Sequence, residues 1–148
     1  MEKEVLLAIK GLQFAVGEEG TQALETITPA EYFMRNGSHY VIYDEVMEGF
    51  EENTRNMIKF KDSLVEVTKK GLMNVHMVFE EKKKNMTSYV TPFGNILIGI
   101  DTADIKIDES EDAISVNVEY TLDANYEHLA DCKIEMNIRS REGGIILQ

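Results

Sequence analysis

The sequence reads ADCKIEMNIR from Ala130 to Arg139, and its apolar and polar side chains alternate without interruption. Successive side chains of a β-strand point to opposite faces of the sheet, so a period of two predicts a strand with one buried and one wet face. A helix would need apolar residues three and four positions apart, and this stretch does not have that spacing. We therefore expect an all-β protein.

The same period recurs along the chain. Residues Ile114–Asp123 (ISVNVEYTLD) alternate in the same way, and neither stretch has helical spacing. Shorter segments repeat the pattern at Val5–Ile9, His39–Tyr43, Val75–Phe79 and Ile96–Ile107. We expect about ten strands in all, with Thr21–Thr28 and Glu31–Arg35 forming one bent strand.

Turn residues separate these segments. Asn36-Gly37 predicts a tight hairpin, because a type I′ turn needs positive φ at both central positions. Thr91-Pro92-Phe93-Gly94 fits a type I turn with Pro92 at its second position. Pro29 has no N–H to donate, so we expect it at a bulge or bend rather than in the middle of a ladder. A short helix at Met47–Met57 or Gln22–Ile27 is the most helical content the sequence allows.

With 148 residues the chain has room for one domain. Hairpins at short intervals without a βαβ rhythm favour a single antiparallel up-and-down β-barrel of about eight to ten strands, with a β-sandwich as the alternative. We assign residues 1–140 to the barrel and residues 141–148 to a C-terminal tail.

The charge and cysteine content restrict the function. A net charge of −12 repels phosphate backbones and anionic lipid surfaces, so we expect neither a nucleic-acid nor a membrane partner. No apolar run approaches the roughly twenty residues of a membrane span. The lone Cys132 cannot form an internal disulfide, and together with the absence of a signal peptide it favours a cytoplasmic location.

No pattern typical of a catalytic site or a metal site is present. The three histidines, His39, His76 and His128, lack metal-ligand spacing, and a partly exposed strand or turn position explains them. Cys132 lies in the apolar register of its strand, as a small buried side chain would. We predict no enzymatic activity, no cofactor and no metal.

The tyrosines and methionines are the remaining indication of function. Tyrosines that line a barrel can hold an amphiphilic ligand, with their rings as walls and their hydroxyls as orienting donors. A filled core is the simpler interpretation, because a small barrel can also pack solid with large aliphatic side chains.

Several segments resemble the YwiB-like family of Gram-positive bacteria over most of the chain, from Glu4 to Arg139. They are Val5–Gln13 (VLLAIKGLQ), Tyr40–Glu45, Lys69-Lys70-Gly71, Met77–Glu80, and Tyr89–Gly94 leading into Ile96–Thr102. The resemblance implies a calycin-like, lipocalin-shaped barrel and an uncharacterised domain of unknown function. Calycin barrels often hold small apolar molecules, but this chain has no Trp and lacks the Gly-x-Trp of lipocalins.

Two hypotheses follow. In the first, the barrel binds a small hydrophobic or amphiphilic molecule; the expected lining residues are Tyr32, Tyr43, Met77, Phe79 and Tyr89. In the second, the barrel is packed and acts as an interaction module, for example as a homodimer. An exposed apolar strand face, such as Val65 and Val67 or the N-terminal strand, would then contact the partner.

Overall fold

The computed structural model describes residues 2–17, 20–46 and 49–140, with side chains at 4–11, 25–46 and 49–140. Residues 141–148, the expected tail, lie outside the described residues. The ten strands are β1 (Glu2–Gly17), β2 (Gly20–Arg35), β3 (Ser38–Glu45), β4 (Thr54–Lys61), β5 (Leu64–Gly71), β6 (Val75–Glu80), β7 (Lys83–Thr91), β8 (Gly94–Glu109), β9 (Ala113–Ala124) and β10 (Glu127–Ser140).

The all-β prediction is confirmed, and the short helix that the sequence allowed does not form in the described part of the chain. Gln22–Ile27 lies within β2, and the end of Met47–Met57 lies within β4. Residues 47 and 48 lie outside the described residues. Across the ranges that the structure describes, we find no helix with the length and apolar character of a membrane span.

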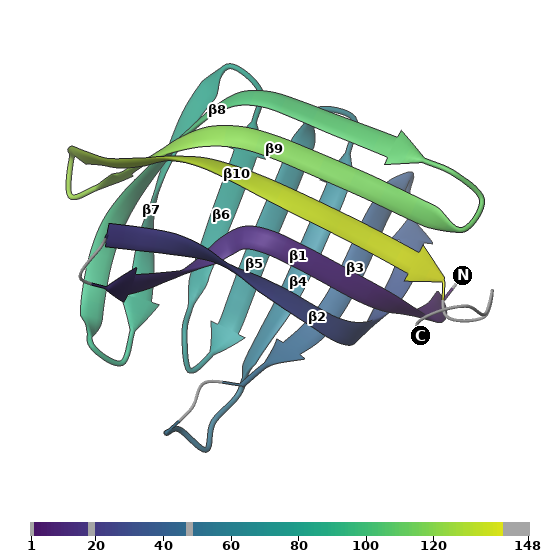
Figure 1. The fold of residues 1–148 in the computed structure, drawn as a ribbon, viewed down its shortest axis with the longest axis horizontal. Helices are drawn as coiled ribbons and strands as arrows, with labels where there is room; N and C mark the ends of the chain where they lie inside the picture. Colours follow the sequence, from purple (N-terminus) through teal and green to yellow (C-terminus); the bar gives the residue numbers. More distant parts are fainter. Residues whose placement is uncertain (1, 18–19, 47–48, 141–148) are drawn as a thin grey trace.

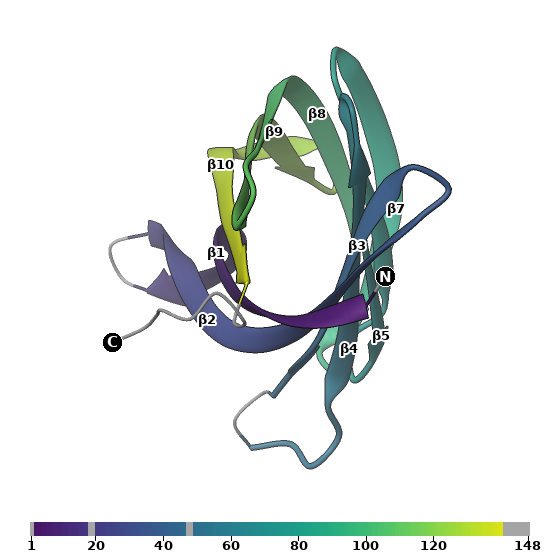
Figure 2. The ribbon, with the colours of Figure 1, turned by 90° about the vertical axis from the view of Figure 1, so that its right-hand side faces the viewer.

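The strands form an antiparallel up-and-down barrel (Figures 1 and 2). Each strand except at the β6–β7 junction forms a ladder with its neighbours in the chain, and β1 also pairs with β10, which joins the two ends of the meander. The barrel is nearly closed. Its last seam runs between β6 and β7, where the ladder is reduced to one bridge between Asn74 and Val90 with two N–H···O bonds of 2.9 Å.

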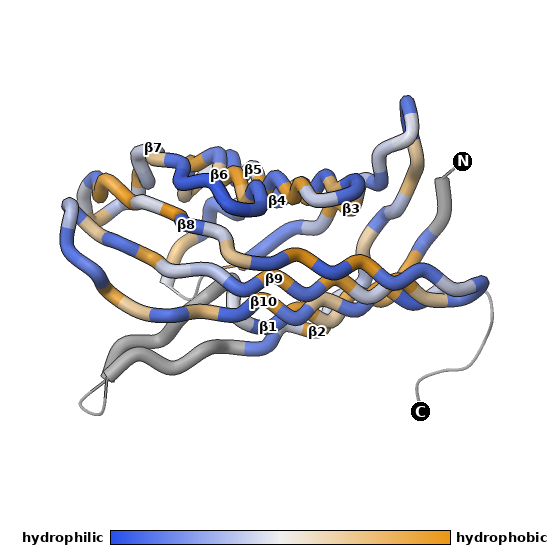
Figure 3. Tube along the Cα trace, turned by 90° about the horizontal axis from the view of Figure 1, so that it is seen from above, coloured by the Kyte–Doolittle hydropathy of each residue, from blue (hydrophilic) through white to orange (hydrophobic). Residues whose placement is uncertain are grey.

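The barrel is flattened, with two layers of strands facing each other (Figure 3). One layer contains β3 to β7 and the other contains β8, β9, β10, β1 and β2. Hydropathy alternates along β9 and β10, as their sequences predict. The apolar side chains that face inward form one buried core, which includes Leu7, Val41, Phe60, Phe79 and Val116.

The predicted turns are present. Asn36 and Gly37 have φ of 52° and 80°, the two left-handed positions that the β2–β3 hairpin requires. Thr91–Gly94 connects β7 and β8, and the Thr91 hydroxyl accepts a hydrogen bond of 3.1 Å from the Phe93 amide. Gly94 has a φ of 129°. Turn chemistry therefore fixes the register of these two hairpins.

Pro29 differs from its predicted position. It pairs with Leu6 in an unshifted part of the β1–β2 ladder, and the register shift of β1 lies between Lys10 and Gln13 instead. Pro29 is nevertheless tolerated, because the β2–β3 ladder spans only Glu31–Arg35 and β2 is an edge strand before that point. β2 and β3 therefore part at Glu31.

Candidate functional site

One row of inward-facing side chains crosses the layer of β3 to β7. The ladders pair Tyr43 with Asn56, Asn56 with Lys69, and Lys69 with Val75. Continuing the register of the Asn74–Val90 bridge brings Tyr89 opposite Val75. Four of these five side chains are polar, so this row forms a polar end of a largely apolar interior.

A buried ion pair lies at this end. The Lys69 ammonium donates to Glu45 Oε1 at 2.8 Å and to Asn56 Oδ1 at 2.7 Å, and the Asn56 amide donates to the same Glu45 oxygen at 3.0 Å. The Lys69 side chain is 1% exposed and that of Glu45 is 11% exposed. Removing two charges from water costs several kcal/mol per ion, and the three hydrogen bonds offset part of that cost.

Two tyrosines flank the ion pair. Burial, and to a lesser extent the negative charge of Glu45, raise the pKa of Tyr89 to about 12. Burial, Glu45 and Tyr89 also raise the pKa of Tyr43. The Tyr89 hydroxyl donates only to the Met73 sulfur, at 3.7 Å, and the Tyr43 hydroxyl has no hydrogen-bond partner among the described residues. Buried tyrosyl hydroxyls usually find a partner, so both can still bind a ligand.

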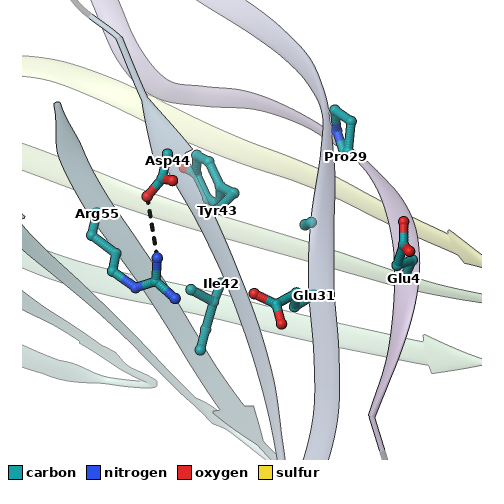
Figure 4. A pocket seen from close by; sticks show the side chains of 8 residues that line it. Glu4, Pro29, Glu31, Ile42, Tyr43, Asp44 and Arg55 are labelled. Atoms are coloured by element: carbon teal, nitrogen blue, oxygen red, sulfur yellow. Dashed lines mark hydrogen bonds and ion pairs between the residues drawn. The ribbon is translucent and has the colours of Figure 1, made fainter.

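An open recess of about 300 Å³ lies where β2 and β3 part, directly outside Tyr43 (Figure 4). Ala30 and Tyr43 belong to the inward-facing register and form its floor. Its rim carries the ion pair between Arg55 and Asp44, 3.4 Å apart, which Figure 4 marks with a dashed line. Known ligand pockets begin at about this volume.

Two other recesses are less suited to a ligand. One of about 370 Å³ lies beside the β4–β5 turn and is lined by Phe60, Leu64, Lys59, Lys61, Asp62, Glu66, Ser38 and Ser63. Most of its polar side chains, such as Lys61, Asp62 and Ser63, are exposed to solvent. The other, of about 80 Å³, lies beneath Glu109 and Tyr32 and has room only for water. The recess above Tyr43 is therefore the candidate site.

Comparison with protein families gives a match over most of the chain. Residues 8–136 match the family described as a domain of unknown function, DUF1934. The chain belongs to this family. The match covers most of the barrel, from β1 to β10, and the resemblance inferred from the sequence is therefore confirmed.

The fold also matches that of a solved structure. The chain is similar to the crystal structure of the ywiB protein from Bacillus subtilis, with a TM-score of 0.76 and 16% sequence identity over 94% of this chain and 92% of the other. At this identity the likeness concerns the fold. A search of the curated proteins finds no match.

All five predicted lining residues of this family member face the barrel interior, but they do not form one group. Tyr43 and Tyr89 lie together at the polar end, and Met77 and Phe79 continue along β6 from it. Tyr32 lies apart from them: its hydroxyl bonds to His39 Nδ1 at 2.7 Å, and His39 lies 3.7 Å from Glu109. Contact of the five with a ligand stays a prediction.

Sequence reasoning missed the three residues that make the polar end, Glu45, Asn56 and Lys69. The same signal was available for all three. Asn56 has the parity of Ile58 and Phe60, Lys69 has the parity of Val65 and Val67, and Glu45 has the parity of Val41 and Tyr43. All three therefore occupy core positions of their strands. A polar residue at a core position predicts a buried hydrogen-bonded network.

Two further expectations are tested by the side-chain positions. Val65 and Val67 do not form an exposed face, because they are buried at 3% and 1% exposure inside the barrel. The N-terminal strand is likewise not free, since β1 pairs on both sides. Cys132 is half-buried against the core. Within the described residues, His, Cys, Asp and Glu side chains do not gather in threes as metal ligands do.

Proposed function

We propose that this protein is a non-enzymatic binding protein for a small amphiphilic molecule. The polar head of that molecule binds at Tyr43, Tyr89 and Glu45, and its apolar part contacts the rings of the two tyrosines. The observation that supports the proposal is the buried Lys69–Glu45–Asn56 network: Asn56 pairs across the β3–β4 ladder with Tyr43, which lines an open recess. A packed structural barrel has no need of such a costly polar group, whereas a binding site uses a few placed polar groups in an apolar setting.

A cytoplasmic location, a Gram-positive origin and a relationship to calycin barrels are expectations that accompany this proposal. In calycins such as lipocalins the ligand lies in the barrel centre. Here the side chains of the barrel centre are closely packed: Phe79 is 0% exposed and meets Tyr120 edge to face, with ring centroids 5.0 Å apart. We therefore place the ligand toward the polar end.

The first test is native mass spectrometry of the protein purified without denaturant, with released small molecules identified. The second uses the uncharged dye Nile red, whose fluorescence rises in an apolar site. Ile42→Trp fills the recess above Tyr43 from its outer wall, since Ile42 is half-buried and lines it. Leu64→Trp is the matched control, because Leu64 is a half-buried aliphatic residue lining the other large recess.

We expect Ile42→Trp to abolish dye binding and to displace any co-purified molecule, and Leu64→Trp to leave both unchanged. The proposal is wrong if the purified wild type carries no small molecule and does not bind the dye. It is also wrong if Ile42→Trp and Leu64→Trp have the same effect on dye binding.

A second candidate function is self-association. β2 pairs only with β1 along Gly20–Ala30, because its ladder with β3 begins at Glu31. An unpaired strand edge is a template for pairing with another chain, and antiparallel pairing of two β2 edges would give a symmetric dimer. Ile27, 63% exposed, lies on this segment. Sedimentation of the wild type and of an Ala23→Pro variant tests it: a dimer that the proline dissociates supports this function, and a monomer at all concentrations contradicts it.

A further inference from the structure

The recess above Tyr43 is acidic. Glu4, Glu31 and Asp44 line it together with one cation, Arg55. In Figure 4 the carboxylate of Glu31 points across the recess toward Ile42 and Arg55, whereas Glu4 lies on the far side of β2. Arg55 forms an ion pair with Asp44 at the rim, so Asp44 partly neutralises its positive charge.

The charges behind the floor of the recess, on Glu45 and Lys69, are balanced. Glu45 and Lys69 neutralise each other, and Lys69 at 1% exposure is the more deeply buried of the two. The carboxylates of Glu31, Asp44 and Glu45 outnumber the two cations, Arg55 and Lys69, and both cations are paired. The protein as a whole carries −12. An anionic head would therefore meet an excess of negative charge, whereas a cationic head would be attracted.

Tyr43 gives an independent indication of a ligand. It is 5% exposed, it lines the recess, and its hydroxyl is without a hydrogen-bond partner in the described part of the chain. A phenol oxygen can accept a hydrogen bond, and the face of a tyrosine ring attracts a cation. Burial is the main cause of the raised pKa of this hydroxyl, and the nearby charge of Glu45 also raises the pKa.

The Glu45 carboxylate can accept further hydrogen bonds. Both of its hydrogen bonds, from Lys69 and Asn56, go to Oε1. Oε2 accepts none from the described residues, and Glu45 is the more exposed partner of its ion pair. Glu45 does not itself line the recess, but it follows Asp44, which does, and its charge acts on Tyr43. A ligand that reaches past Tyr43 would find two acceptors, the Tyr43 hydroxyl and Glu45 Oε2, beside an aromatic face.

We propose that the polar head bound in this recess is a protonated amine, which donates to the Tyr43 hydroxyl and to Glu45 Oε2 and is reached through the gap between β2 and β3. This inference rests on the proposed function and specifies its ligand class. The apolar part of the amine packs against the tyrosine rings and Ala30. Glu31 and Asp44 at the rim attract the cation before it binds.

The test compares three probes with the same alkyl chain, nonylamine, nonanol and nonanoate, by isothermal titration calorimetry at about pH 7, where the amine is protonated and the acid is ionised. We expect nonylamine to bind about tenfold tighter than nonanol, and nonanoate to bind weakest. Raising the sodium chloride concentration from about 0.05 M to about 0.5 M lowers the affinity for nonylamine but not the affinity for nonanol.

Variants separate a specific site from general attraction to an acidic protein. We expect Tyr43→Phe and Glu31→Gln each to lower the affinity for nonylamine about tenfold and to leave the affinity for nonanol unchanged. Tyr40→Phe and Glu66→Gln are the controls: Tyr40 stacks on Phe33, with ring centroids 4.8 Å apart, and Glu66 lines the other large recess. Glu31 is an exposed residue, so its variant keeps the test valid even if Tyr43→Phe is unstable.

The outcomes are distinct for the two proposals. If nonanol binds as tightly as nonylamine and Ile42→Trp abolishes both, an amphiphile site exists but the amine proposal is wrong. If nonylamine is preferred but neither Tyr43→Phe nor Glu31→Gln changes its affinity, the amine proposal is wrong as well. If no probe binds, both the amine proposal and the proposed function fail.

Discussion

Lys69 and Glu45 form an ion pair of 2.8 Å inside a β-barrel, with the lysine side chain 1% exposed. The two residues are 24 positions apart in the sequence and come from β5 and β3, which are separated by β4. Asn56 of β4 stands between them and binds both. Lys69 and Asn56 lie in one cross-strand row, and Glu45, two residues beyond Tyr43 on β3, reaches it diagonally. The stability of the ion pair therefore depends on all three residues.

We predict that Lys69→Met destabilises the protein by about 3 kcal/mol, because removing one partner leaves the Glu45 carboxylate buried without its cation. Glu45→Gln has a similar cost for the converse reason. The double variant recovers about 1 kcal/mol or more, since no charge is then left unpaired. Urea unfolding followed by circular dichroism measures all three. Arg55→Met, which breaks the pair with Asp44 at 58% and 56% exposure, is the control and costs less than about 0.5 kcal/mol. Equal losses for Lys69→Met and Arg55→Met would contradict this account.

Gly11 gives a prediction about the barrel wall. It has a φ of +94°, and a Cβ on it would lie 1.9 Å from the Lys133 carbonyl oxygen. Its own carbonyl accepts a hydrogen bond of 3.1 Å from the Tyr120 hydroxyl, so the backbone cannot move away without losing that bond. We expect Gly11→Ala to cost about 3 kcal/mol, from backbone strain and the clash together.

Gly49 is the matched control for Gly11. Its φ is +91°, and a Cβ there would have nothing within 4 Å. Gly49→Ala therefore carries only the conformational cost of positive φ, about 1 kcal/mol. Thermal unfolding of the two variants separates the clash from the strain, and equal melting temperatures would exclude the clash at Gly11.

Local patterns in the sequence predicted most of the fold. The alternation in Ala130–Arg139 and Ile114–Asp123 predicted β10 and β9, because a half-buried strand places its side chains with a period of two. Asn36-Gly37 predicted the β2–β3 turn, since few residue pairs accept two positive φ angles. The position of Pro29 was wrong because the local rule cannot tell where a neighbouring strand ends, and β3 leaves β2 at Glu31.

The candidate site was only partly predictable. The sequence pointed to Tyr43 and Tyr89 because tyrosines on strands can line a barrel interior with their rings and hydroxyls. Lys69 and Asn56 were missed, although each has the parity of the core residues of its strand. A single polar residue at such a position is easily taken for the end of the strand. Glu45 could not be connected to either, since its contact depends on the registers of two ladders.

Tyr89 gives a prediction about alkaline stability. Its pKa is about 12 in the folded protein, mainly because of burial, against an ordinary value of about 10 in an unfolded chain. Above pH 10 the unfolded chain therefore releases a proton that the folded protein keeps, so the free energy of unfolding is unaffected below about pH 10 and falls between about pH 10 and pH 12. In Tyr89→Phe this contribution is absent. We expect the wild type to lose about 1 kcal/mol more than the variant between pH 10 and pH 11 in urea unfolding. Parallel pH profiles for the two proteins would show that Tyr89 is not buried as described.

Cys132 gives a prediction about thiol reactivity. Burial raises the pKa of its thiol, and the nearby charge of Asp131 raises it further, while a hydrogen bond with Tyr120 acts in the opposite direction. Tyr120 pairs with Cys132 across the β9–β10 ladder, and the thiol packs against the core. Since the thiolate is the reactive form, we expect a thiol reagent such as dithionitrobenzoate to react with the folded protein at about pH 8 at least about tenfold more slowly than with the protein unfolded in guanidinium chloride. Glutathione measured in both solutions corrects for the effect of the denaturant on the reagent. Equal corrected rates would mean that the thiol is open to solvent, and the inward register of β10 at this position would then be wrong.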